Sequence, residues 1–321
     1  MPKISVVVPI YNVSQYIEKC VRSLMEQTLN DIEYIFVNDC SPDNSIEILN
    51  NTLQDYPQRR PYVKIIHHDV NCGLTSARNS GLALASGDYV VHCDSDDWVD
   101  STMYEELYLK AIEDNADVVY SDIRMIFKNY SKIYTAAPFA SEKSAMIKNY
   151  ISSAWTCLVN MIVKRDIYTK YNLVSPIHLC YCEDFWLSVR LLHYANKITY
   201  LNKSFYNYNR INETSIVHKL NKRSEKEEQT AYLETIDFFT REGCIECYEK
   251  EMSWRILKSK QELILDVDYH NEFLEIYPIS HNYIWTCPYI NWKLKFFMWL
   301  LVNNMNAFLC LILRTRTILG R

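Results

Sequence analysis

The chain has 321 residues, of which 49% are hydrophobic and 23% are charged, and its formal net charge is −5. This composition excludes an intrinsically disordered chain, and the acidic balance gives no general attraction to nucleic acid, so no nucleic-acid partner is expected. Eleven cysteines are scattered without paired spacing, and no signal peptide is recognisable. We therefore predict a cytoplasmic protein with free thiols. Cys244-x-x-Cys247 has no second ligand pair and is interpreted as two ordinary helix thiols.

Short apolar runs alternate with helical patterns through the first part of the chain. We predict strands at 3–9, 32–38, 63–67, 88–93 and 118–121, separated by helices at 17–24, 46–53, 74–86 and 103–115. This alternation predicts an α/β fold with a doubly wound, mostly parallel sheet, which binds ligands outside the carboxyl ends of its strands. Farther on, a hairpin is predicted at 124–134, a helix at 184–194 and a strand at 204–210.

Three carboxylates directly follow the fourth predicted strand. Asp94, Asp96 and Asp97 stand within four residues. Carboxylates crowded together are costly unless a cation or hydrogen-bond donors offset their charge. Hard oxygen ligands suit Mn²⁺ or Mg²⁺, so the spacing indicates a divalent-metal site. A solvated acidic turn before the next helix is the alternative interpretation.

Other polar residues also follow predicted strands. Tyr11, Asp39 and Arg78 lie after strand ends or in adjoining loops, where one crevice would collect them with the acidic cluster. The pair Glu183-Asp184 opens a later predicted helix. Carboxylates are favoured at a helix N-terminus by the helix dipole alone, so the pair has a structural explanation as well as a catalytic one.

The C-terminal part of the chain differs from the rest. Residues 219–251 are charged and helical in pattern, whereas residues 292–313 are strongly apolar and interrupted by asparagines. Basic residues flank the apolar segment on both sides: Lys293, Lys295, Arg314, Arg316 and Arg321. Aromatic and basic residues together favour a helix lying in the interface at the cytoplasmic face of the plasma membrane. A core or oligomer helix and a membrane-spanning helix are the alternatives.

Five motifs, taken in order, resemble those of family 2 glycosyltransferases. They are Val8-Pro9-Ile-Tyr11-Asn12, Asn38-Asp39-Cys-Ser41, Asn71-x-Gly73 with Ala77-Arg78-Asn79-x-Gly81, Asp94-Ser95-Asp96-Asp97, and Glu183-Asp184. The resemblance implies inverting, metal-dependent enzymes of the GT-A fold that use nucleotide-sugar donors. It implies a GT-A domain over 1–218, with a nucleotide-binding half at about 1–122 and an acceptor half at about 123–218, and a helical C-terminal region at 219–321.

The resemblance also implies the partners and the donor contacts. The donor would be a UDP-sugar, and the acceptor a saccharide or lipid-linked saccharide in surface polysaccharide synthesis. Tyr11 would stack on the uracil and Asp39 would accept its imide N–H, while Gly73 and Arg78 would bind the diphosphate and Asp94 the ribose. The remaining donor-binding positions implied are Pro9, Asn12, Asn71, Ser95, Arg210 and Ser215, and the metal positions are Asp96 and His218, which would hold Mn²⁺ or Mg²⁺.

The implied reaction is direct displacement at the anomeric carbon by an acceptor hydroxyl. The resemblance assigns the general base to Asp184, with Glu183 orienting it or touching the donor sugar. The sequence departs from the family pattern at Cys40, where relatives frequently have glycine. Two other function classes remain open: a non-catalytic nucleotide-sugar-binding scaffold, and a sugar nucleotidyltransferase. The latter usually has a Gly-rich basic loop after its first strand, and Pro9-Ile-Tyr11-Asn12 does not provide one.

Overall fold

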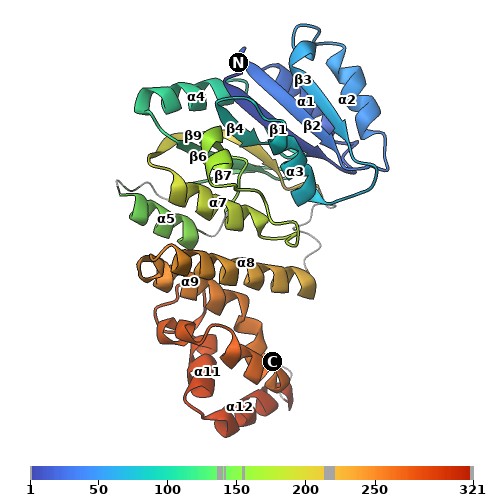
Figure 1. Ribbon diagram of the computed structural model, residues 1–321. Helices are drawn as coiled ribbons and strands as arrows, with labels where there is room; N and C mark the ends of the chain where they lie inside the picture. The colour runs from blue at the N-terminus through green and yellow to red at the C-terminus, as the bar shows by residue number, and fades with distance from the viewer. Residues whose placement is uncertain (1, 136–139, 141, 154–155, 213–220, 319–321) are drawn as a thin grey trace. The chain divides into compact units, whose positions relative to one another are not determined.

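A computed structural model describes residues 2–135, 140, 142–153, 156–212 and 221–318. The chain forms two compact units, Met1–Leu220 and Asn221–Arg321. The first unit is built on one mixed sheet with helices on its faces, and the second contains helices alone in its described residues (Figure 1). Each unit is described by itself below.

The first four strands form the parallel half of the sheet. They pair in the order β3-β2-β1-β4 and are joined by three helices, with bounds β1 Ile4–Ile10, α1 Ile17–Met25, β2 Ile32–Asn38, α2 Ser45–Leu53, β3 Val63–His67, α3 Leu74–Ala83 and β4 Tyr89–His92. The chain moves outward from β1 to β3 and then returns to place β4 beside β1. Doubly wound sheets bind ligands where the strand order reverses, so the expected binding position is at the carboxyl ends of β1 and β4.

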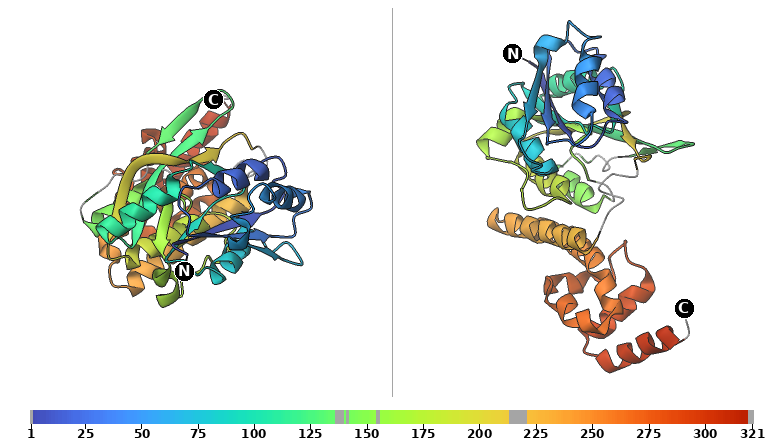
Figure 2. Two further views of the ribbon diagram at one scale, coloured as in Figure 1. Left: turned by 90° about the horizontal axis from the view of Figure 1, so that it is seen from above. Right: turned by 90° about the vertical axis from the view of Figure 1, so that its right-hand side faces the viewer.

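The remaining strands extend the sheet in the order β8-β6-β9-β5, and β7 pairs with β6 in a ribbon that projects from the sheet in the right-hand view of Figure 2. Both parallel and antiparallel pairs occur in this half. The elements are β5 Trp98–Val99, α4 Met103–Asp114, β6 Val118–Ile126, β7 Ser131–Tyr134, α5 Lys143–Ser152, β8 Met161–Lys164, α6 Arg165–Lys170, α7 Glu183–Tyr194 and β9 Ile198–Asn209.

Alternating residues of the central strands pack on opposite faces of the sheet. On one face, Val6 and Val8 of β1 belong to a large apolar core that includes residues of α1, α2 and α4. On the other face, α3 packs close to β1. A Cβ atom at Gly81 of α3 would lie 2.4 Å from Cγ1 of Val7, so the lack of a side chain permits this approach. The close packing fixes the position of α3, which carries Arg78.

The second unit corrects two sequence-based expectations. The helical stretch predicted at 219–251 is divided at Gly243, which has a φ of +67°. The apolar stretch at 292–313 is divided by a turn in which Asn304 has a φ of +59°. The helices of this unit are α8 Lys222–Arg241, α9 Ile245–Ser259, α10 His270–Glu275, α11 Trp292–Val302 and α12 Asn306–Ile318.

Helix α11 contributes to the core of the second unit through Met298, Leu300 and Leu301, which are buried. Helix α12 buries Leu309 and exposes Phe308 and Leu311. In the part of the chain that the structure describes, no helix combines the length and apolarity needed to cross a bilayer.

Candidate donor-binding and catalytic site

Arg78 of α3 joins three carboxylates from separate parts of the first unit. Its guanidinium is 1% exposed. Nη2 lies 2.9 Å from Oδ1 of Asp94, and Nη1 lies 2.8 Å from Oε1 of Glu183 and 2.5 Å from Oδ1 of Asp184. Asp94 follows β4, whereas Glu183 and Asp184 are the first two residues of α7. The structure therefore brings together four residues that the sequence motifs assigned to one site.

Burial and mutual repulsion raise the pKa values of Glu183 and Asp184. Burial, and then the adjacent charge of Asp184, raises the pKa of Glu183 to about 8. Burial also raises the pKa of Asp184, although the Arg78 guanidinium opposes the shift. The side chain of Asp184 is 21% exposed and that of Glu183 is 8% exposed, so Asp184 is the carboxylate that an entering substrate can reach.

The donors of Arg78 face protein carboxylates in this structure. Both Nη atoms are used in the ion pairs, and the buried Nε atom has no hydrogen-bond partner. His92, also buried, lies at the end of β4 with both ring nitrogens unpartnered. Burial, and then the Arg78 charge, lowers the pKa of His92 to about 3, so this ring is neutral. Arg78 thus positions Asp94 and Asp184, and its contact with a diphosphate stays a prediction.

The other two carboxylates of the acidic cluster are held from β9 and the residues after it. Nδ2 of Asn212 donates to Oδ2 of Asp96 at 2.7 Å. The hydroxyl of Tyr206 and the backbone N–H of Asn209 each donate to Asp97, both at 2.7 Å. Sequence reasoning missed these three positioning residues because they lie more than a hundred residues downstream. The alternating aromatic and polar pattern at 204–210 was the available signal.

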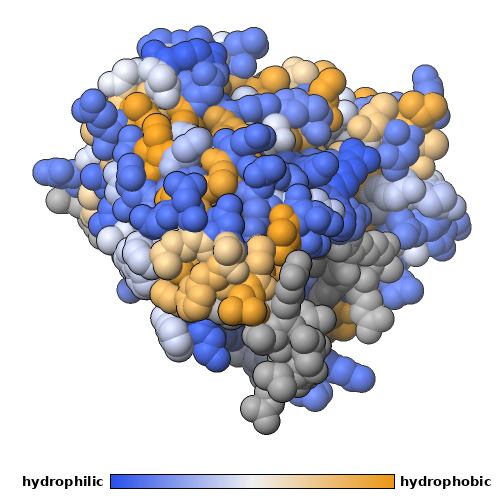
Figure 3. All heavy atoms as spheres, turned by 90° about the horizontal axis from the view of Figure 1, so that it is seen from below, coloured by the Kyte–Doolittle hydropathy of each residue, from blue (hydrophilic) through white to orange (hydrophobic). Residues whose placement is uncertain are grey.

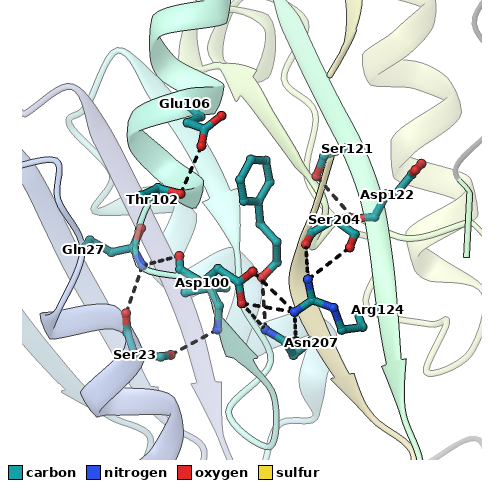
Figure 4. Close-up of polar contacts among 12 residues, drawn as sticks. Ser23, Gln27, Asp100, Thr102, Glu106, Ser121, Asp122, Arg124, Ser204 and Asn207 are labelled. Atoms are coloured by element: carbon teal, nitrogen blue, oxygen red, sulfur yellow. Dashed lines mark hydrogen bonds and ion pairs between the residues drawn. The ribbon is translucent and has the colours of Figure 1, made fainter. Parts of the chain in front are cut away.

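The strand that follows the acidic cluster is fixed by a second polar network (Figure 4). Asp100 accepts from Nδ2 of Asn207 at 2.9 Å, and Nη1 of Arg124 donates to Oδ1 of Asn207 at 2.9 Å. Gln27 of the loop after α1 donates to the backbone oxygen of Asp100 at 3.0 Å. Because α1, β6 and β9 all hold this segment, the loop from Asp94 to Asp97 is anchored at its C-terminal end.

Asp96 has the properties of a cation ligand. Burial, and then the charge of Asp94, raises the pKa of Asp96 to about 6. Asp94 faces Arg78 and Asp97 faces Tyr206, whereas among the described residues the side chain that donates to Asp96 is the neutral amide of Asn212. A positive charge at Asp96 would offset this repulsion, so the residues present fit Mn²⁺ or Mg²⁺. Such an ion takes its other ligands from water and substrate phosphate when a single protein carboxylate holds it.

Asp39 organises the other end of the candidate site. Its Oδ1 accepts from the backbone N–H of Cys72 at 2.8 Å and lies 2.7 Å from Nδ1 of His68. Its Oδ2 accepts from the N–H of Gly73 at 2.8 Å. A carboxylate has about four acceptor positions, so one remains on Oδ2. Tyr11, after β1, is 48% exposed, and its contact with a donor base stays a prediction.

The turns after β1 and β2 are bonded to each other. The N–H of Asn12 donates to Oγ of Ser41 at 2.8 Å, and the N–H of Asp39 donates to the carbonyl of Ile10. Both Asn12 and Cys40 have a φ of +55°. Cys40 therefore adopts the left-handed conformation that glycine reaches most easily, at the position where the resemblance led us to expect glycine.

Comparison with known proteins identifies the family. The model of "Glycosyl transferase family 2" matches residues 5–171. The chain belongs to this family. It is 30% identical to the uncharacterized glycosyltransferase EpsJ of Bacillus subtilis (strain 168) over 277 residues, which cover 83% of this chain and 78% of that protein.

Solved structures show the same GT-A fold for this glycosyltransferase, as the sequence predicted. The S. aureus TarS 1-349 complex with UDP-GlcNAc matches with a TM-score of 0.71 and 16% identity, over 99% of this chain and 92% of that one. The mannosyltransferase PcManGT from Pyrobaculum calidifontis, in complex with GDP-Man and Mn²⁺, matches with a TM-score of 0.57 and 13% identity, over 95% and 87% of the respective chains.

The remaining predicted donor-site residues of this glycosyltransferase have separate positions. Pro9 is buried in β1, and Ser95 is buried within the acidic loop. Asn71 accepts the N–H of Gly73 at 3.2 Å. The guanidinium carbon of Arg210 lies 6.0 Å from the centre of the Tyr208 ring. Ser215 and His218 lie outside the described residues.

Proposed function

We propose that this protein is an inverting, metal-dependent glycosyltransferase that moves a sugar from a UDP-sugar to a hydroxyl of a saccharide or lipid-linked saccharide. The observation that carries the proposal is that one guanidinium, that of Arg78, holds both Asp94 and Asp184. Asp94, the proposed donor-binding carboxylate, and Asp184, the candidate base, are thereby held by the same guanidinium. The UDP-GlcNAc complex of TarS supports a UDP-sugar as donor.

The donor nucleotide would bind at the carboxyl ends of β1, β2 and β4. Tyr11 supplies an exposed ring for the uracil face, and the remaining acceptor position of Asp39 suits the imide N–H. Asp94 has its Oδ1 on Arg78, which leaves Oδ2 to accept from a ribose hydroxyl. Gly73 is the N-cap of α3, which begins at Leu74, and a helix N-terminus favours a phosphate.

Asp96 would hold Mn²⁺ or Mg²⁺ with water and the donor diphosphate, and Asn212 keeps its carboxylate in place. The cation would supply charge stabilisation for the departing nucleoside diphosphate. The Mn²⁺ in the PcManGT complex supports this assignment. His218 stays a proposed further ligand.

Asp184 would take the proton of the acceptor hydroxyl as that oxygen attacks the anomeric carbon. Its raised pKa makes it a stronger base than an ordinary aspartate. Glu183, which retains its proton near neutral pH, does not compete for this role. An attack by the acceptor from the face opposite the leaving diphosphate inverts the anomeric configuration, because a single displacement has no covalent intermediate.

A lipid-linked acceptor agrees with the surface of the second unit, which we propose binds the inner face of the plasma membrane. On the face in Figure 3, apolar side chains form a group with hydrophilic ones along part of its border. Helix α12 exposes Phe308 and Leu311, three residues apart, and Met305 precedes them at the same spacing. Residues 292–321 contain five basic residues and no Asp or Glu, in a chain of net charge −5. Apolar side chains with basic neighbours suit an anionic lipid surface.

A panel of nucleotide-sugars tests the proposed reaction. We expect the protein with Mn²⁺ to bind one or more UDP-sugars and to hydrolyse them slowly without acceptor, and to bind GDP-sugars more weakly. Isothermal titration measures binding, and release of UDP measures turnover. Tight binding without turnover, with every acceptor offered, would support the non-catalytic scaffold instead. Preference for a GDP-sugar would contradict the proposed donor class.

A further inference from the structure

We propose that Asp39, His68 and Cys72 form a binding site for a zinc-type divalent cation at the base-binding end of the donor pocket. Among the described residues, these three side chains place carboxylate, imidazole and thiol donor atoms all within 4.8 Å of one another. Mixed sulfur, nitrogen and oxygen ligands favour Zn²⁺ over the harder Mg²⁺ and Mn²⁺. Three protein ligands also leave a fourth position of a tetrahedral ion for water.

The carboxylate of this site is already oriented by the backbone. Asp39 is 2% exposed and accepts the N–H groups of Cys72 and Gly73, both at 2.8 Å. The backbone N–H of Cys72 is thus hydrogen-bonded to the Asp39 carboxylate. The Cys72 thiol and this carboxylate would bind the same cation. Little reorganisation of the loop is needed to bring the two ligands to one ion.

The imidazole of His68 can change its tautomer and keep its hydrogen bond to Ser80. Nε2 lies 2.9 Å from Oγ of Ser80, and Nδ1 lies 2.7 Å from Oδ1 of Asp39. A serine hydroxyl can either donate to Nε2 or accept from it. When Nδ1 binds a cation, Nε2–H donates to Ser80, which is the outer hydrogen bond that metal-bound histidines usually make. Binding then costs the hydrogen bond between His68 and Asp39, and thiolate formation at Cys72 also removes the hydrogen bond from its thiol to the carbonyl of Val70.

Cys72 provides entry from solvent. The residue is exposed, and its thiol makes a long contact of 3.4 Å to the carbonyl of Val70. Binding of Zn²⁺ as a thiolate complex releases the thiol proton to solvent. The site differs in chemistry from Asp96, where the neighbouring protein groups offer oxygen ligands.

A cation at this site would exclude the nucleotide, an inference that rests on the proposed role of Asp39 toward uracil. Coordination places a positive charge on the Asp39 carboxylate, to which the imide N–H would donate. Zinc binding would therefore inhibit donor binding at the base, separately from any effect at Asp96.

Direct metal binding tests the site without reference to the nucleotide. The purified full chain is titrated with Zn²⁺ against a chromophoric chelator, and with Co²⁺ to detect the thiolate charge-transfer absorption. We expect Cys72→Ser to weaken Zn²⁺ binding by at least about 10–100-fold, since loss of an outer-shell partner alone costs that much. Cys247→Ser, which removes an exposed thiol of the second unit, should leave that affinity unchanged. Equal effects of the two variants would overturn the site. His68→Gln gives a second test, with the same loss expected.

Competition between Zn²⁺ and UDP tests whether a cation at this site excludes the nucleotide. In Mg²⁺ buffer, saturating Zn²⁺ should weaken UDP binding to the unmodified chain by at least about tenfold, and it should not do so in Cys72→Ser. Unchanged UDP affinity while Zn²⁺ is bound through Cys72 would refute the exclusion. Failure of UDP to bind under any condition, with the Cys72-dependent zinc site intact, would contradict the proposed function and support the metal site.

Discussion

Nη1 of Arg78 lies 2.5 Å from Oδ1 of Asp184, and this contact ties the candidate base to the helix that carries the donor-binding motif. The other side of the same guanidinium holds Asp94. The planar guanidinium of arginine fixes the direction of both carboxylates as well as their distance. The ammonium group of lysine does not fix direction. One buried residue therefore holds both Asp94, the proposed donor-binding carboxylate, and Asp184, the proposed base.

Replacing Arg78 by Met should destabilise the first unit by about 3–5 kcal/mol, because the partly buried carboxylates of Asp94 and Asp184 lose their cation and buried Glu183 loses a hydrogen-bond donor. Urea unfolding followed by circular dichroism measures the change. Arg60→Met removes an exposed arginine, and its urea midpoint should equal that of the unmodified chain within error. A midpoint for Arg78→Met equal to that of the control would show that the carboxylates do not depend on the ion pairs.

Replacing Asp184 by Asn should leave UDP binding unchanged and lower the transfer rate by about 10²–10⁴-fold, the usual contribution of a general base. Calorimetry with UDP and a transfer assay measure the two effects. Asp166→Asn, at the exposed first turn of α6, is the matched control. Full transfer activity in Asp184→Asn would place the base elsewhere.

The stability of the first unit should fall as pH rises, in part because of Glu183. Its pKa is about 8 in the folded chain and 4.5 ordinarily, so between these values the folded state binds the proton and the unfolded state does not. The proton's stabilising effect is complete below pH 4.5 and is lost as pH rises through about 8.

Glu183→Gln mimics the protonated acid and should therefore flatten this dependence, gaining stability relative to the unmodified chain at pH 9 but not at pH 5. Thermal melts across this range measure the difference. Glu47→Gln, at the exposed start of α2, should follow the unmodified chain. Parallel curves for Glu183→Gln and the unmodified chain would mean that Glu183 is ionised throughout.

Replacing Asp96 by Ala should abolish the dependence of UDP binding on Mn²⁺. Asn212→Leu should weaken the same dependence by about 10–100-fold, since Asn212 donates to the carboxylate that would hold the ion. Titrations with and without Mn²⁺ measure both. Asp69→Ala removes an exposed carboxylate as a control. Unchanged metal-dependent affinity in Asp96→Ala would count against the proposed ligand.

Replacing Phe308 and Leu311 together by Asp should reduce membrane binding by at least about tenfold, because each buried apolar side chain contributes about 1.5–3 kcal/mol. Sedimentation with vesicles of equal parts phosphatidylglycerol and phosphatidylcholine measures binding, and pure phosphatidylcholine vesicles test the contribution of charge. Leu233→Asp, an exposed apolar position on α8, is the control. No binding of the unmodified chain to either vesicle would refute the membrane proposal.

The sequence predicted the parallel half of the fold well because its signals are local. Residues such as Val6 and Val8 belong to continuous apolar runs, and polar turns mark where each strand ends. Two of the boundaries that were wrong have a clear physical reason. Helix α3 ends at Ala83 before the expected Gly87, which instead fits tightly against the backbone of Ile4 and Ser5. Strand β9 begins at Ile198 instead of 204, because pairing with β6 extends it through a polar stretch.

The candidate site was predictable in its motif residues but not in their partners. The family resemblance assigned Arg78 to the diphosphate, but its contacts to Asp94, Glu183 and Asp184 join segments up to 106 residues apart. No periodicity encodes such pairs. The same holds for Asn212, whose amide reaches back to Asp96 across 116 residues.

The absence of a side chain at Gly81 explains the glycine of the Ala77-Arg78-Asn79-x-Gly81 motif by its packing. Gly81 and Arg78 are three residues apart on α3, so the glycine meets Val7 of the sheet about one helical turn from the guanidinium. A single methyl group at position 81 would push the helix off the strand and carry the arginine with it. Gly81, which has no reactive group, therefore determines how close the Arg78 guanidinium lies to the sheet.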